Sequence, residues 1–133
     1  MNFKQLITTN AILFIGLGIA FALYGPLMIA FFGILESDGS PVQYWYAASF
    51  ARMLGAALFG FGFLLFALRR FNQPVGGEVE RGITLAMIIA NALGLLVALT
   101  QQVSIWGTMM GWLAAGLFLA LLTSYAYLFV RKA

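Results

Sequence analysis

The chain has 133 residues, of which 63% are hydrophobic and 8% are charged, and its formal net charge is +3. A soluble domain of this length exposes too much surface to hide that much apolar area, so a water-soluble fold is excluded and the surrounding medium is lipid. The chain has neither cysteine nor histidine, which excludes disulfides, thiol chemistry, the usual zinc and haem ligand and the commonest general base.

Four long apolar segments follow one another along the chain, and each exceeds the roughly 18 residues that mark a membrane span. They cover residues 11–35, 44–68, 82–100 and 104–130. The runs are continuous rather than alternating, which predicts helices instead of barrel strands. Short connections make neighbouring helices antiparallel. The predicted fold is therefore all-α, a single transmembrane domain over residues 1–133 built as an up-down-up-down four-helix bundle, with Pro26 bending the first helix.

Basic residues gather on one side of this predicted bundle. Six of the seven flank its ends on that side: Lys4, Arg69, Arg70, Arg81, Arg131 and Lys132. The other two connections carry no Lys or Arg, and the first of them contains Glu36 and Asp38. The positive-inside rule then predicts that both termini are cytoplasmic. Because the spans leave no basic face, no nucleic-acid partner is expected.

Small residues recur at every fourth position of the last two spans. The stripes are Gly82, Ala86, Ala90, Gly94 and Ala98 in the third span, and Gly107, Gly111 and Ala115 in the fourth. In lipid, helices gain little from hydrophobic burial against each other and associate through close van der Waals approach. The stripes therefore predict helix-packing faces.

Arg52 is the one charge inside a predicted span, eight residues after Tyr44 and so about 12 Å along the helix. It shares a small-residue face with Ala48 and Ala56, which predicts a guanidinium turned into the bundle. The candidate polar partners are Glu36 and Asp38 in the outer loop, Asn91 and Tyr24, and further polar atoms near the same side come from Thr108 and the Gln101-Gln102 pair.

Several interpretations of Arg52 stay open. It ties its helix to the first loop while Asn91 makes an interhelical hydrogen bond, or it lines a pocket for an anionic ligand or lipid headgroup. A charge relay and pairing with a partner protein are the remaining alternatives. Catalysis is not expected, since no pair of carboxylates lies within the spans and no base accompanies the hydroxyl groups. Neither a metal nor another cofactor is predicted.

Three segments carry a resemblance: "ARMLGAALFGFGFLLFALRR", "IIANALGLLVAL" and "GTMMGWLAAGLFLAL". They resemble small bacterial four-span inner-membrane proteins, broadly DoxX-like, with Arg52 before Leu54-Gly55, Asn91 before Leu93-Gly94, and Gly111-Trp112. The resemblance implies the bacterial inner membrane. The expected role is a non-catalytic accessory or scaffold subunit that packs with other membrane proteins or itself. The alternative is a lipid or small-molecule binding or transport protein with a polar site around Arg52.

Overall fold

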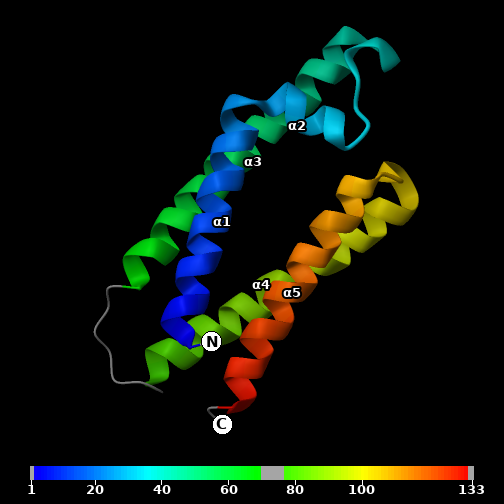
Figure 1. The fold of residues 1–133 in the computed structure, drawn as a ribbon. Coiled ribbons are helices and arrows are strands. Elements are labelled where there is room, and N and C mark those ends of the chain that lie inside the picture. The colour runs from blue at the N-terminus through cyan, green and yellow to red at the C-terminus, as the bar shows by residue number, and fades with distance from the viewer. Residues whose placement is uncertain (1, 70–76, 132–133) are drawn as a thin grey trace. The chain divides into compact units, whose positions relative to one another are not determined.

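The computed structural model describes residues 2–69 and 77–131, and the regular structure in these ranges is entirely helical (Figure 1). The long helices are α1 (Phe3–Leu23), α3 (Pro41–Leu68), α4 (Glu78–Gln101) and α5 (Met109–Arg131). The short elements are α2 (Gly25–Phe31), a 3₁₀ turn (Glu36–Asp38) and a π-helical turn (Gln102–Trp106). The all-α prediction is confirmed. Arg70 and Lys132, two members of the predicted charge bias, lie outside the described residues.

Among the described residues, four helices are long and apolar enough to cross a membrane. They are Phe3–Leu23, Pro41–Leu68, Glu78–Trp106 and Met109–Arg131. Each exceeds the length of about 20 residues that a hydrocarbon core about 30 Å thick requires. The chain is therefore an integral membrane protein with four candidate spans.

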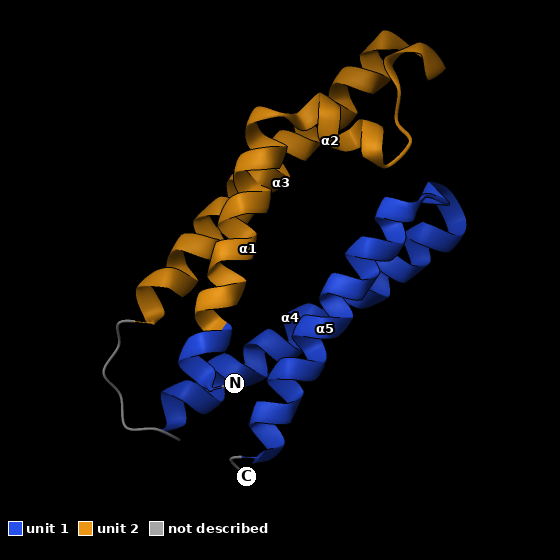
Figure 2. Cartoon of the chain, viewed as in Figure 1, with its two compact units in different colours: residues 1–6, 70–133 blue, residues 7–69 orange. Residues whose placement is uncertain are grey.

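The chain divides into two compact units, shown in different colours in Figure 2. One unit is Ile7–Arg69, with α2, α3 and most of α1, and the other joins Met1–Leu6 to Arg70–Ala133, with α4 and α5. Within each unit the long helices pack as an antiparallel pair.

The first helix begins at Phe3 rather than at residue 11. Asn2 and Gln5 form a reciprocal cap: the Gln5 backbone N–H donates to Asn2 Oδ1 at 2.8 Å, and the Asn2 N–H donates to Gln5 Oε1 at 3.0 Å. This arrangement satisfies donors that a helix start leaves without partners. The polar residues before the apolar run are therefore part of the helix.

Pro26 interrupts the first helix instead of only bending it. α1 ends at Leu23, Tyr24 adopts a non-helical φ of −117° and ψ of 38°, and α2 starts at Gly25 with Pro26 in its first turn. Proline has no N–H to donate to the preceding turn, and its ring crowds that turn. Helical hydrogen bonds resume when the Met28 N–H donates to the Tyr24 carbonyl oxygen at 2.9 Å.

Glycines bring the backbones of α1 and α3 together. A Cβ built on Gly55 would lie 2.7 Å from the carbonyl oxygen of Gly18, and one built on Gly18 would lie 2.8 Å from that of Gly55. Further along the pair, a Cβ on Gly62 would lie 3.0 Å from the carbonyl oxygen of Ala11. Ordinary Cβ contacts lie at 3.4–4 Å, so side chains at these positions would hold the helices apart.

α4 and α5 join through a π-helical turn that is longer than the predicted three-residue connection at 101–103. The turn ends at Gly107, whose φ of 59° is in the left-handed region that glycine adopts without strain. The Gly107 N–H donates to the carbonyl oxygen of Gln102 at 3.1 Å. The fifth helix consequently begins at Met109 rather than at residue 104.

Candidate functional site

Arg52 lies beside the break between α1 and α2. A Cβ on Gly25 would approach the Arg52 Cγ to 3.1 Å and its Nε to 3.5 Å, so the stem of the arginine lies directly over the glycine. Side chains of a helix lean toward its N-terminus. The Arg52 stem accordingly passes over the turn that contains Ala48, whose carbonyl oxygen is 3.3 Å from the same Cβ position. Glycine at position 25 thus provides the space in which the arginine stem lies.

The charge of Arg52 has no acceptor in the part of the chain that the structure describes: its guanidinium makes neither a hydrogen bond nor an ion pair there. Within its own unit its side chain is exposed rather than enclosed between helices. That Arg52 turns into a four-helix bundle stays a prediction. A guanidinium has five N–H donors and does not lose its charge in proteins. An acceptor from outside these residues is needed to satisfy it.

The predicted partners in the same unit do not supply that acceptor. Glu36 and Asp38 form the exposed 3₁₀ turn, and Tyr24 is exposed at the N-terminal boundary of α2. Within the described ranges, none of the three makes a hydrogen bond or ion pair with Arg52. The predicted link between Arg52 and the first loop is therefore not formed in the structure.

The remaining predicted polar residues belong to the unit that contains α4 and α5. Asn91 is buried, and its Nδ2 donates to the carbonyl oxygen of Met87 at 2.7 Å, one turn earlier in its own helix. The expected interhelical bond is thus an intrahelical one. Thr108 accepts from Gln102 Nε2 at 2.7 Å through its carbonyl oxygen, and its Oγ1 accepts from the Gly111 N–H at 3.4 Å.

Two further amides are buried in the helices, and of these the sequence interpretation missed Asn10. Asn10 is fully buried in α1, and Gln102 is 4% exposed at the start of the π-helical turn. The Gln102 amide fills the space in front of Gly111, and a Cβ there would lie 2.6 Å from Gln102 Cδ. The predicted first span begins at residue 11, one residue after Asn10. The signal that could have included Asn10 in the helix is the Asn2–Gln5 cap at the true helix start.

The predicted small-residue positions take different roles. Gly94 and Ala98 lie on the part of α4 that faces α5: a Cβ on Gly94 would lie 2.5 Å from Phe118 Cε1, and Ala98 is buried. Gly111 and Ala115 are buried in α5, and Gly107 ends the turn. By contrast, the first three residues of the α4 stripe are exposed: Gly82, Ala86 and Ala90.

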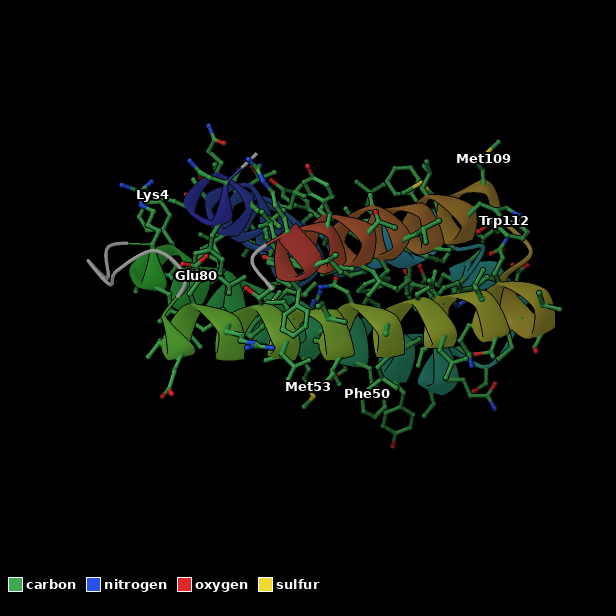
Figure 3. The ribbon with its side chains drawn as sticks, turned by 90° about the horizontal axis from the view of Figure 1, so that it is seen from below. Lys4, Phe50, Met53, Glu80, Met109 and Trp112 are labelled. Atoms are coloured by element: carbon green, nitrogen blue, oxygen red, sulfur yellow. The ribbon has the colours of Figure 1, made fainter. Side chains whose placement is uncertain are left out.

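The exposed surface of the helices is strongly apolar. Figure 3 shows the side chains of Phe50 and Met53 on α3, and of Met109 and Trp112 on α5, directed away from the helices that carry them. Such side chains are what a lipid-facing surface requires. In the described part of the chain, acidic side chains do not form a group of three or more that would suggest a metal site.

Comparison of the sequence with protein-family models and curated proteins, and with solved structures, found no match. Four long apolar helices are consistent with a small four-span membrane protein, and no family is identified.

Proposed function

We propose that this chain is a non-catalytic accessory or scaffold subunit that packs inside the membrane against other membrane proteins or a second copy of itself. The observation that carries this proposal is the exposed face of α4 formed by Gly82, Ala86 and Ala90. The two antiparallel pairs achieve close approach at small residues, as at Gly18 and Gly55. The α4 face offers the same property to a further helix.

The charge pattern supports the orientation with both termini in the cytoplasm. Among the described residues, Lys4 lies in the first turn of α1, Arg69 directly follows α3, Arg81 lies in the first turn of α4 and Arg131 ends α5. In an antiparallel pair the start of the first helix and the end of the second lie at the same end. Lys4 and Arg69 therefore share one end of their pair, and Arg81 and Arg131 share one end of theirs. The bacterial inner membrane is proposed from the DoxX-like resemblance of the sequence.

The packing role is tested by the mass of the protein purified in a mild detergent. The chain itself is 14.5 kDa, so the proposal expects either a multiple of this mass or a co-purifying membrane subunit. Ala86→Leu and Ala90→Leu should shift the assembly toward the single chain, whereas Ala92→Leu, on another exposed side of α4, is the matched control. A wild-type protein that is a single chain in detergent and in native nanodiscs would contradict the proposal.

A second candidate function is favoured by Arg52: a lipid or small-molecule binding or transport protein with its site around this residue. The support is an exposed guanidinium on a membrane-spanning helix, with no acceptor among the described residues. Placing an arginine mid-membrane costs roughly 2.5–3.5 kcal/mol on insertion scales, and a bound anion would offset part of that cost. Mass spectrometry of the purified protein tests this candidate, because Arg52→Leu should lose a molecule that the wild type retains.

A further inference from the structure

We infer that Arg52 binds the phosphate group of a membrane phospholipid whose acyl chain lies along α3. This inference rests on the second candidate function and names the ligand of that site. Its first support is the unsatisfied guanidinium, because a planar fork of N–H donors matches the oxygens of a phosphate and binds them in pairs. Hydrocarbon offers no acceptor, so within a span the acceptor is a headgroup, water or another protein.

The second support is the depth and direction of the side chain. Trp45 and Tyr46 are exposed near the N-terminal end of α3, where amphipathic rings mark a membrane interface, and Tyr44 packs edge-on against Trp45. Arg52 lies six to seven residues further along, about 10 Å deeper. Its stem leans back over the Ala48 turn, toward that same interface. A long basic side chain in this position reaches for the headgroup level.

The third support is an exposed apolar stripe that begins at Arg52. Ala56, Phe59 and Phe63 follow it by four, seven and eleven residues, which keeps all of them within about 60° on the helix. Phe59 is 38% and Phe63 55% exposed, and their rings lie 5.2 Å apart. Measured from the Ala48 turn, over which the arginine stem leans, the roughly 15 Å of one hydrocarbon leaflet covers about ten residues of α3, as far as Ala56 and Phe59, and Phe63 lies deeper.

These dimensions favour a lipid over a free anion or an acidic partner protein. A phosphate at the guanidinium, near the level of the Ala48 turn, places an acyl chain of one leaflet against Ala56 and Phe59. Gly25 keeps the arginine stem close to α2, so the guanidinium faces the ligand from a supported position. A free anion would make no use of Phe59.

Native mass spectrometry of detergent-purified protein titrated with phosphatidylglycerol tests the inference. Arg52→Gln should weaken phosphatidylglycerol binding by about tenfold or more, the range of a charge-assisted hydrogen bond, and Arg52→Lys by less. Phe59→Ala should also weaken it, because Phe59 is 38% exposed and contacts the acyl chain in the proposed site. Phe50→Ala is the matched control, because Phe50 is 69% exposed on the same helix but lies about 160° around from Arg52. Diacylglycerol with the same chains lacks the phosphate and should bind the wild type and Arg52→Gln equally weakly.

Every variant is first checked for wild-type helicity and an unchanged unfolding midpoint. Equal phosphatidylglycerol binding by wild type and Arg52→Gln would overturn the lipid inference. If inorganic phosphate nevertheless raises the unfolding temperature of the wild type and not of Arg52→Gln, the site binds free anions and the second candidate function survives. If neither probe distinguishes the two proteins, both fail. Loss of a larger assembly in Arg52→Gln, without a lipid effect, would assign the residue to a partner protein and overturn the inference.

Discussion

The crossing of α1 and α3 at Gly18 and Gly55 predicts a large response to one added methyl group. In Gly55→Ala the new Cβ would meet backbone: the carbonyl oxygen of Gly18 at 2.7 Å, the carbonyl carbon of Phe21 at 2.8 Å, and the nitrogen of Ala22 closer still. Because backbone atoms of a helix do not rotate away as side chains do, the two helices must separate.

The required separation follows from these distances. Restoring even the short end of ordinary contact, 3.4 Å, from 2.7 Å needs about 0.7 Å. A gap of 0.5–1 Å forfeits about a quarter to a half of the dispersion energy of each affected contact. Dispersion is the main attraction between helices in lipid, so we expect Gly55→Ala to destabilise the protein by about 1–3 kcal/mol, the usual cost of overpacking.

Unfolding in mixed micelles with an increasing fraction of SDS, followed by circular dichroism, measures this change. Gly60→Ala is the matched control, since it lies on the same helix and its Cβ would meet nothing within 4 Å. It should be neutral or stabilising by up to about 1 kcal/mol, the gain in helix propensity from glycine to alanine. Gly18→Ala should add less to Gly55→Ala than it costs alone, because the helices are already apart. A Gly55→Ala protein as stable as Gly60→Ala would refute the close crossing.

Three further predictions use the same unfolding assay. Gly111→Ala should cost about 1 kcal/mol, less than Gly55→Ala, because the Gln102 amide beside the new Cβ can rotate aside but then loses its hydrogen bond to Thr108. Gly116→Ala, whose Cβ would meet nothing within 4 Å, should not destabilise, and equal unfolding midpoints would contradict this packing. Gly107→Ala should destabilise the protein by about 1–2 kcal/mol, because Gly107 has a positive φ and its Cβ would meet no other atom. Gly107→Asn should cost less, since asparagine tolerates this conformation better. An unchanged stability of Gly107→Ala would contradict the left-handed turn. Asn91→Leu should change stability by no more than about 1 kcal/mol, because the amide bonds a carbonyl of its own helix, and a loss of several kcal/mol would indicate an interhelical partner.

The number and type of the helices were predictable because uninterrupted apolar runs leave a chain in lipid few alternatives. Helix boundaries were harder. The start of α1 depends on the hydrogen bonds between Asn2 and Gln5, a local pattern that hydrophobicity does not register. The π-helical turn after Gln101 was not predictable, because the sequence of Gln102–Trp106 has no signal that distinguishes it from the end of the third span and the start of the fourth.

The α4 stripe shows why residue spacing alone overestimates a packing face. A step of four residues turns a helix by about 40° beyond one full turn, so the stripe rotates by about 160° between Gly82 and Ala98. The buried face of α4 instead follows mixed steps of three and four, through Thr84, Met87 and Asn91. Only the last two stripe residues, Gly94 and Ala98, therefore reach α5, and the others face elsewhere.

The polar groups in the helices differ in where their hydrogen bonds go, and this difference singles out Arg52. The Asn91 and Gln102 amides each donate to a nearby backbone carbonyl, so these residues satisfy part of their bonding capacity locally while buried. Arg52 has the largest donor capacity of the three and, within the described residues, uses none of it. The sequence located this charge, but its environment depends on the break at Pro26, which brings Gly25 under the arginine stem. An arginine that tied α3 to the first loop would bond Glu36 or Asp38, and among the described residues it bonds neither. An exposed arginine with a supported stem and an unsatisfied guanidinium is better suited to recruit an acceptor from the surrounding membrane.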